Sequence, residues 1–197
     1  MTVIVDEFIF ARSGRVGDLD WTLVSGSGTP MASEPGTIGI YRTDTTAVGG
    51  TYAIVHQGGT TTRIADVRYK TFVVRPSNND ANTMIRIGQI GDPIADPPAD
   101  GVYIEKTTAD STWFYVCRSG GVQTRVDSGI TLDTSNFVAL AMINLGNAWR
   151  FSVQDQAITD IDTNVPGSVQ SYITWGVRNT AAASKKLDIT RVEFEVP

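Results

Sequence analysis

The stretch Trp149-Arg150-Phe151-Ser152-Val153-Gln154 alternates apolar and polar side chains over six consecutive residues. Successive side chains of a β-strand point to opposite faces, so this alternation predicts a strand with one buried face and one solvated face. Trp149, Phe151 and Val153 are expected to point into a core. The stretch therefore favours β-structure, and the rest of the chain can be tested against that expectation.

The composition of the whole chain favours strands in the same way. Its 197 residues include 24 Thr, 20 Val and 17 Ile, against 6 Leu, 5 Glu and 4 Lys. Side chains that branch at Cβ lose χ1 freedom in a helix but pack well on a pleated sheet. Turn signals recur about every 8 to 12 residues, which is typical of antiparallel sandwiches. We predict one domain over residues 1–197, an all-β antiparallel two-sheet β-sandwich with almost no helix.

Two tight turns are predicted within this sandwich. Ser119-Gly120-Gly121 indicates a hairpin, because glycine accepts the positive φ that two-residue turns require. Gln154-Asp155-Gln156 is a second hairpin candidate.

Two strands have unusual patterns. The segment from Phe137 to Ile143 is apolar on both faces, which predicts a central strand or one that faces a partner chain. Near the C-terminus, Leu187 and Ile189 share one phase of the alternation, whereas the following apolar positions are shifted by one residue. A β-bulge near Thr190-Arg191 would keep all of them inward, the shifted positions being Val192, Phe194 and Val196.

The charge balance excludes several classes of protein. The chain has 16 Lys+Arg against 21 Asp+Glu, a net charge of −5 and a pI of about 4.8, which argues against a nucleic-acid partner. One cysteine cannot form an intrachain disulfide, and no Cys/His set is available for zinc. Residues 1–8 lack the basic region of a signal peptide, and no apolar run is long enough for membrane insertion. We expect no cofactor.

Catalytic groups are sparse. His56 is the chain's one imidazole, and no Gly-x-Ser-x-Gly elbow accompanies it, so we interpret it as a solvated or loop-bonded histidine. Glu193 and Glu195 share a strand face, as a carboxylate pair for glycoside hydrolysis would. Arg191 lies in the same row, however, which favours a solvated charged face. The Glu-x-Asp-x-x-Glu strand of jelly-roll glucanases is absent. We therefore predict no catalytic residues and no enzyme.

Metal binding is not predicted either. The segment Asp160-Ile161-Asp162-Thr163-Asn164 begins like a calcium loop, but Val165 stands where the sharp turn requires glycine. Ser171 stands where a bidentate glutamate belongs. The aspartates of the loop 91–101 are better explained by turn chemistry and solvation.

Aromatic side chains carry the remaining binding signal, because a flat ring can stack on a sugar. Trp113 and Tyr115 share one strand face and could form such a platform, although Trp113, Trp149 and Trp175 are more simply core or subunit-interface residues. Cys117 is most simply a small buried apolar residue. The loops from Gly91 to Gly101 and from Asp162 to Gln170 could present polar groups. The candidate ligand-binding residues are Trp113, Tyr115, Asp96, Asp100, Asp162 and Asn164.

The second half of the chain has a familiar layout. It resembles the concanavalin-like jelly-roll domains of bacteriophage tail fibres, tail spikes and head fibres over roughly residues 100 to 197, on the segments 122–130, 137–144, 149–156, 158–166 and 187–196. In those domains a Phe-x-Val-Asn-Gly hairpin precedes a strand that ends in Thr-Asn-x-Pro. Phe151 to Gln156 and Thr163-Asn164-Val165-Pro166 are similar here, with Gln154-Asp155-Gln156 in place of the Asn-Gly turn.

The resemblance implies a structural protein on the virion surface, a tail-fibre or head-decoration domain and often a trimer. Its partners would be a host cell-surface glycan or neighbouring virion proteins. Synthesis in the host cytoplasm without a signal peptide agrees with this expectation. A free-standing carbohydrate-binding lectin domain is the alternative, and a divergent polysaccharide lyase or hydrolase is the third hypothesis.

Overall fold

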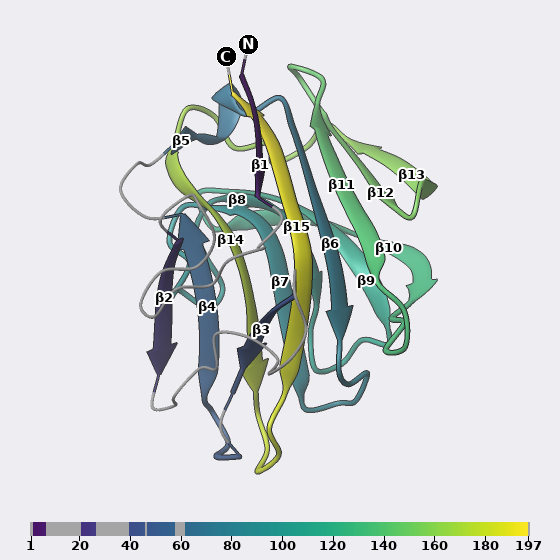
Figure 1. Cartoon of the computed structure of the whole chain (residues 1–197). Coiled ribbons are helices and arrows are strands. Elements are labelled where there is room, and N and C mark those ends of the chain that lie inside the picture. Colours follow the sequence, from purple (N-terminus) through teal and green to yellow (C-terminus); the bar gives the residue numbers. More distant parts are fainter. Residues whose placement is uncertain (1, 7–20, 27–39, 46, 58–61, 197) are drawn as a thin grey trace.

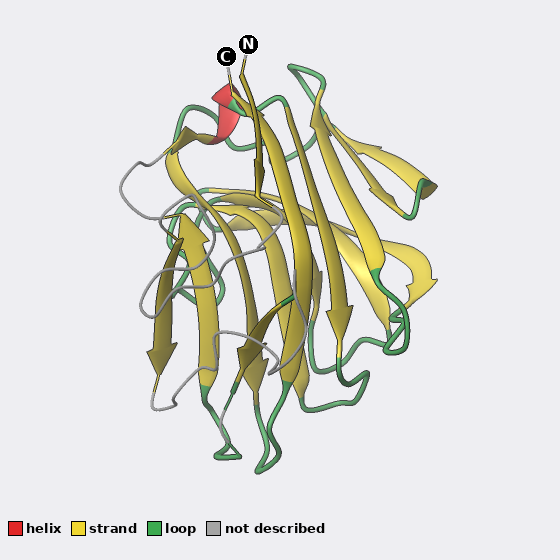
Figure 2. Cartoon of the chain, viewed as in Figure 1, coloured by secondary structure: helices red, strands yellow, loops and turns green. Residues whose placement is uncertain are grey.

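The computed structural model describes residues 2–6, 21–26, 40–45, 47–57 and 62–196. Two antiparallel sheets face each other, and the helical structure of these residues is limited to one 3-10 turn, η1 (Ile64–Asp66) (Figures 1 and 2). The predicted all-β, two-sheet sandwich is confirmed. The described part of the chain contains no helix with the length and apolarity of a membrane span.

One layer is a seven-stranded sheet with the order β1-β15-β6-β11-β12-β13, in which β3 also pairs with β15. Its strands are β1 (Thr2–Asp6), β3 (Tyr41–Asp44), β6 (Tyr69–Pro76), β11 (Val138–Asn144), β12 (Trp149–Val153), β13 (Gln156–Ile161) and β15 (Lys186–Val196).

The other layer is an eight-stranded sheet with the order β10-β9-β8-β7-β14-β4-β2, in which β5 also pairs with β14. Its strands are β2 (Trp21–Gly26), β4 (Tyr52–Gln57), β5 (Thr62–Arg63), β7 (Thr83–Ile90), β8 (Gly101–Lys106), β9 (Thr112–Ser119), β10 (Val122–Thr131) and β14 (Gln170–Asn179). In Figure 1 this sheet lies behind the seven-stranded one.

The predicted bulge lies in β15. Ile189 pairs with Val74 and Arg191 pairs with Val73, so Thr190 is the extra residue. The shift keeps both halves of the strand facing the core, and the side chains of Leu187, Ile189, Val192 and Phe194 are fully buried. The side chain of Val196 lies outside the described residues.

Both predicted hairpins are present. Gly120 and Gly121 have φ values of 54° and 87°, and they connect β9 to β10. Gln154 and Asp155 have φ values of 52° and 56° and connect β12 to β13. The positive φ values suit the twist of the flanking strands in both turns, although only the first turn has glycine at these positions.

The core lies between the sheets and includes residues from Trp21 to Phe194. Trp113, Trp149 and Trp175 are all buried in it, as the core interpretation of these residues predicted. The segment 137–143 contributes β11, which lies between β6 and β12 and is therefore a central strand. Tyr115 stacks on Phe151 across the two layers, with ring centroids 5.3 Å apart.

One end of the core contains a buried lysine. The Nζ of Lys70 donates a hydrogen bond to Oε1 of Gln89 at 2.7 Å and lies 3.9 Å from the ring centroid of Trp149. Gln89 in turn donates to Oγ of Ser171 at 2.8 Å. Burial holds the pKa of Lys70 well below its ordinary value. The thiol of Cys117 is also buried, as predicted, and burial raises its pKa to about 12.

Candidate functional site

Two of the predicted ligand-binding residues, Trp113 and Tyr115, are inside the core. Both side chains have 0% of their surface exposed. The hydroxyl of Tyr115 donates to the backbone oxygen of Ala157 at 2.9 Å, which links the two sheets. The prediction of a sugar platform is corrected here: these rings face inward, where they fill the space between the layers, and a ligand cannot reach them.

Asp96 and Asp100 lie in the connection between β7 and β8, which crosses the outer face of the eight-stranded sheet. Asp96 accepts from Arg86 at 3.3 Å and from Arg178 at 3.2 Å, and it remains about one third exposed. The Oδ1 of Asp100 accepts from the backbone N–H of Gly120 at 2.9 Å, so Asp100 fastens the connection to the β9–β10 turn. Only Asp96 of this pair faces the site described below.

Asp162 and Asn164 lie elsewhere. The Nδ2 of Asn164 donates to Oγ1 of Thr124 at 3.0 Å, and Thr124 pairs in register with the core residue Cys117. Asn164 is therefore on the core side of β10, whereas Asp96 is on its sheet's outer side. Asp162 is exposed in the same loop as Asn164. The structure does not bring the two predicted loops together into one site.

A small apolar cluster lies between the connection 91–100 and the eight-stranded sheet. Ile90, Tyr103 and Val116 are buried although they belong to the outer face of the eight-stranded sheet, on three adjacent strands. Pro93 and Pro98 of the connection are also buried. The connection therefore packs on the sheet as part of the folded structure, and it divides the outer face.

A hollow of about 330 Å³ lies beside this connection. It is lined by Met84, Arg86, Asp96, Pro97, Tyr103, Glu105, Thr107, Arg118, Gln123 and Arg125. We call it the arginine groove. A smaller hollow of about 20 Å³ borders Arg86 on another side and is lined partly by Pro93 and Arg178. The arginine groove has the size of a small-ligand site, whereas the smaller hollow has room for about one water molecule.

The centre of the arginine groove is a buried carboxylate between two arginines. Glu105, 4% exposed, accepts from Nε of Arg125 at 2.9 Å and from Nη2 of Arg86 at 3.2 Å. Arg86 also pairs with Asp96, and Arg125 with Asp110. Burial alone would raise the pKa of Asp110, but hydrogen bonds from Thr107 and the ion pair with Arg125 hold it below its ordinary value.

The two arginines are further held by aromatic rings. The guanidinium carbon of Arg125 lies 3.4 Å from the ring centroid of Phe114, and that of Arg86 lies 5.1 Å from that of Tyr103. Stacking of this kind orients a guanidinium plane without using its hydrogen-bond donors. The arginine groove therefore has charged groups in fixed positions.

Two polar atoms of the arginine groove, the hydroxyl of Tyr103 and Nε of Arg118, are buried and make no hydrogen bond of standard geometry with the described residues. Their two side chains nevertheless interact with each other. Buried donors are normally satisfied, so such exceptions require an explanation. Trp113 Nε1 is a similar exception in the core, remote from any described groove.

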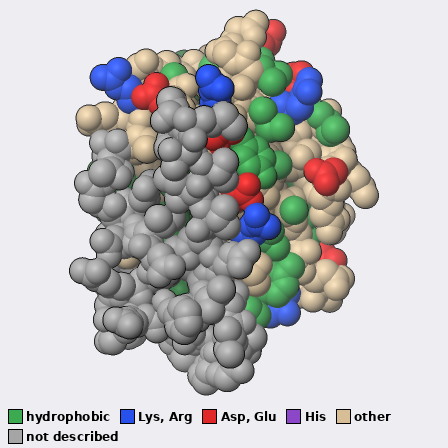
Figure 3. Space-filling view, turned by 45° about the horizontal axis from the view of Figure 1, so that its top comes forward, with side chains coloured by type: hydrophobic (Ala, Val, Ile, Leu, Met, Phe, Trp, Pro, Cys, Tyr) green, Lys and Arg blue, Asp and Glu red, His purple; other side chains and the backbone are tan. Residues whose placement is uncertain are grey.

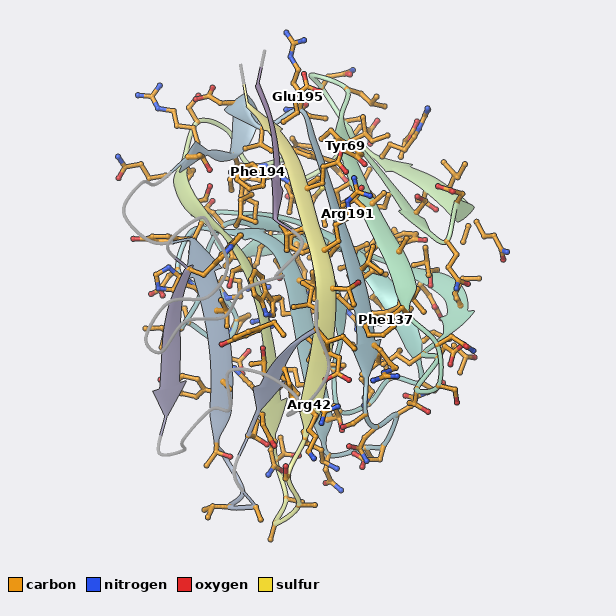
Figure 4. The ribbon with its side chains drawn as sticks, in the orientation of Figure 1. Arg42, Tyr69, Phe137, Arg191, Phe194 and Glu195 are labelled. Atoms are coloured by element: carbon orange, nitrogen blue, oxygen red, sulfur yellow. The ribbon has the colours of Figure 1, made fainter. Side chains whose placement is uncertain are left out.

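The other residues considered for catalysis are not part of this groove. The ring of His56 lies 4.8 Å from that of Tyr172, on strands β4 and β14. Glu193 is paired with Arg191 at 2.5 Å on β15, as expected for a charged row on a solvated face; Arg191 is labelled in Figure 4. Figure 3 shows acidic, basic and apolar side chains interspersed over the described part of the face in view.

The arginines of the groove were missed by the sequence analysis. Arg86, Arg118 and Arg125 belong to β7, β9 and β10, so no run of basic residues marks them in the sequence. The available signal was alternation: Arg86 lies between the inward Ile85 and Ile87 and must point outward. That signal assigns a face but does not say which strands are neighbours.

Comparison with known proteins identifies the fold. No protein-family model and no curated protein matches the chain. Among solved structures, a glycosidic hydrolase matches with a TM-score of 0.69 and 14% identity, covering 100% of this chain and 98% of that one. The β-glucanase of Bacillus licheniformis matches with a TM-score of 0.68 and 14% identity, covering 99% and 98%. The carbohydrate recognition domain of Emp47p matches with a TM-score of 0.69 and 13% identity, covering 98% and 94%.

These neighbours are concanavalin-like jelly rolls, so the predicted fold type is correct. The prediction that the chain is not an enzyme is contradicted, because two of these three neighbours are glycoside hydrolases that match over nearly their whole length. The prediction depended on the absence of a glucanase motif. A missing motif does not exclude hydrolysis, because one fold can carry different sites.

Proposed function

We propose that this protein binds carbohydrate in the arginine groove. The observation that carries the proposal is the groove itself: a hollow of about 330 Å³ in which carboxylates, guanidiniums, an amide and the apolar side chains of Met84 and Pro97 converge. Sugars are recognised by such a combination, since their hydroxyls need fixed donors and acceptors and their C–H faces need ring or apolar surface. Structural neighbours that include a carbohydrate recognition domain support this choice.

The proposal places the ligand against β8, β9 and β10 and the edge of the connection 91–100. Asp96 can accept hydrogen bonds from sugar hydroxyls, while Gln123 can both donate and accept. Glu105 is buried and holds Arg86 and Arg125 in place. Gln123 is exposed on β10, so the arginine groove is open to solvent on that side. The connection is fastened by Asp100, which preorganises this wall and lowers the cost of ordering it on binding.

The test is a glycan array followed by calorimetric titration, with the full chain and two variants. Gln123→Trp places a large ring at the mouth of the arginine groove. Binding is expected to weaken at least about tenfold while the melting temperature is unchanged. Ile158→Trp is the matched control, because Ile158 is 62% exposed on β13 in the other sheet. Binding that is equal in both variants would place the ligand elsewhere.

A hydrolysis assay on the same glycans shows whether a bound glycan is also cleaved. Each oligosaccharide that binds is incubated with the protein, and reducing ends are counted over time. Release that stops in Gln123→Trp and continues in Ile158→Trp would assign hydrolysis to the arginine groove. Binding without release would assign recognition alone.

We further propose that this binding serves attachment or assembly on a bacteriophage particle, as a tail-fibre or head-decoration domain on the virion surface. The sequence resemblance over residues 100–197 supports this narrower proposal. It predicts a homotrimer, with a mass by light scattering of three times 21.2 kDa. A stable monomer at micromolar concentration would overturn the trimer and leave carbohydrate binding to be judged by titration.

A further inference from the structure

Arg118 differs from the other arginines of the groove in its partners. Arg86 and Arg125 each contact two carboxylates. The described partner of Arg118 is neutral: its Nη1 donates to Oε1 of Gln123 at 2.6 Å. Its Nε is buried and makes no hydrogen bond of standard geometry with the described residues. Arg118 therefore keeps a positive charge that no described carboxylate balances.

The Tyr103 side chain lies beside Arg118. The Tyr103 ring is fully buried and lies over Gly101, where a Cβ would come within 2.9 Å of Cδ1 of Tyr103. Burial raises the pKa of Tyr103 to about 12, with Glu105 adding to the rise, while the charges of Arg86 and Arg118 and a hydrogen bond with the Arg118 side chain oppose it. The hydroxyl therefore stays protonated near neutral pH and interacts with the Arg118 guanidinium.

The two side chains are neighbours on one face of the sheet. Gly101 pairs with Arg118 and Tyr103 pairs with Val116, so Tyr103 and Arg118 are diagonal neighbours on β8 and β9. Both line the arginine groove. Tyr103 is fully buried and cannot contact a ligand, whereas the half-buried Arg118 can. Its guanidinium, which no described carboxylate pairs, is therefore the group of the groove that can bind an acceptor from outside the chain.

The charges of the lining indicate which acceptor fits. Three arginines and two carboxylates line the arginine groove, an excess of one positive charge in a chain whose net charge is −5. Asp110 and Arg178 contact the lining residues from outside the groove, and because one is negative and the other positive they leave the excess charge unchanged. One negative charge would therefore be balanced, whereas a doubly charged group would face Glu105 and Asp96 with its second charge uncompensated.

We propose that the arginine groove selects a sugar that carries one singly charged oxyanion, the carboxylate of a uronic acid or a sulfate ester. Arg118 binds the oxyanion through its guanidinium, and the buried Tyr103 side chain beside it supports that guanidinium. This inference rests on the proposed carbohydrate binding and specifies its ligand class. Asp96, which is partly exposed, accepts from the hydroxyls of the same sugar.

The test compares acidic and neutral oligosaccharides of the same backbone by calorimetric titration. The probes are tetragalacturonate, tetraglucuronate and tetramannuronate, the corresponding neutral tetraoses, and galactotetraose sulfated at O6. At least one acidic probe is expected to bind about tenfold or more tightly than its neutral counterpart, and less tightly as salt is added. Preference for the uronates or for the sulfated probe identifies the oxyanion.

Arg118→Gln tests the assigned residue. It is expected to weaken the acidic probe at least about tenfold and to leave the neutral probe within about twofold. Arg150→Gln is the matched control, since Arg150 is an exposed arginine paired with Asp160 on the other sheet. An equal loss for both classes of probe would reduce Arg118 to a structural residue and would overturn the inference.

Tyr103→Phe separates ligand binding from stability. The buried hydroxyl interacts with the Arg118 side chain, so its removal is expected to loosen that guanidinium and to weaken the acidic probe about three- to tenfold, while the neutral probe stays within about twofold. A lower melting temperature with unchanged affinity would show that the hydroxyl serves the fold, contrary to the proposal.

The outcomes distinguish this inference from the proposed function. Equal binding of acidic and neutral probes that is blocked by Gln123→Trp would overturn the inference and retain carbohydrate binding in the arginine groove. Failure of every probe, and of the glycan array, would overturn both.

Discussion

The outer face of each sheet carries a buried carboxylate between two arginines, but the two faces differ in how many of the neighbouring polar groups are paired. On the seven-stranded sheet, Asp188 is 5% exposed and lies between Arg42 and Arg75 of the neighbouring strands; Arg42 and Phe137 are labelled in Figure 4. On the eight-stranded sheet, Glu105 lies between Arg86 and Arg125. In each row a guanidinium stacks on a phenylalanine, Arg75 on Phe137 and Arg125 on Phe114.

The difference lies in what remains unpaired beside each carboxylate. Both oxygens of Asp188 accept from arginines, at 2.6 Å and 2.9 Å from Arg42 and 2.7 Å from Arg75. Beside Glu105 there is a hollow and an arginine, Arg118, without a described carboxylate. A closed row of this kind holds strands in register, whereas an incomplete one leaves donors for a ligand.

The largest effect is expected at the closed row. Asp188→Asn leaves two guanidiniums facing each other on adjacent strands, so the free energy of unfolding should fall by about 3 kcal/mol. Urea denaturation measures this loss. Binding in the arginine groove should be unchanged, because Asp188 belongs to the other sheet. A loss below about 1 kcal/mol would show that the row contributes no more than an exposed ion pair does.

Glu105→Gln should cost less, about 2 kcal/mol, because Arg86 retains Asp96 and Arg125 retains Asp110. The variant also raises the excess charge of the arginine groove from one to two. Affinity for tetragalacturonate or another acidic probe should therefore rise a few-fold, as measured by titration. The comparison between the two faces would fail if Glu105→Gln were as destabilising as Asp188→Asn and had no effect on binding.

Lys70, between the two sheets, contacts Gln89 and Trp149 and has no carboxylate partner among the described residues. Its pKa in the folded protein is below the ordinary 10.5, so the unfolded chain binds more protons in the interval between the two values. Stability should consequently rise with pH, by up to about 1.4 kcal/mol per pH unit. Denaturation between about pH 7 and 8.5 avoids the titration of Cys117, whose raised pKa acts in the opposite direction at higher pH.

Lys70→Met should abolish that slope, and Lys186→Met, at a half-buried position on β15, should retain it. A wild-type protein whose stability is flat over this interval would show that Lys70 stays charged inside the core. The core would then hold a charged lysine without a described carboxylate partner, in contrast to Asp188 and Glu105, which are buried between paired arginines.

The smallest effect is expected at the wall of the arginine groove. Asp100→Ala removes the acceptor for the Gly120 N–H and should lower the free energy of unfolding by about 1 kcal/mol. The connection 91–100 then loses one attachment, so the affinity of the folded protein for its ligand should fall a few-fold. Urea denaturation and titration of the same sample measure the two changes. An unchanged affinity would show that this wall does not shape the site.

The sequence predicted the elements of this fold in some detail. Alternation at Trp149, Phe151 and Val153 assigned their faces correctly, and the phase change after Ile189 located the bulge. The glycines at 120 and 121 marked their turn. These features are local, since face and turn depend on residues that are adjacent along the chain.

Alternation did not distinguish the core face of β9 from its solvent face. Trp113 and Tyr115 alternate with Phe114 and Val116, and both phases are apolar, so either could have faced a ligand. The structure places Trp113 and Tyr115 inside because the other sheet covers that side. Val116 is covered by different means, through the cluster under the connection 91–100.

What the amino-acid sequence determined by itself is the strand content, the positions of turns and bulge, and the inward face of most strands. Only the tertiary structure decided that Arg86, Tyr103, Arg118 and Arg125, from four different strands, line one groove. The physical reason is that strand order is set by packing and hydrogen bonding between segments far apart in the chain. A periodicity of two residues specifies which way a side chain points and carries no information about which strand lies next to it.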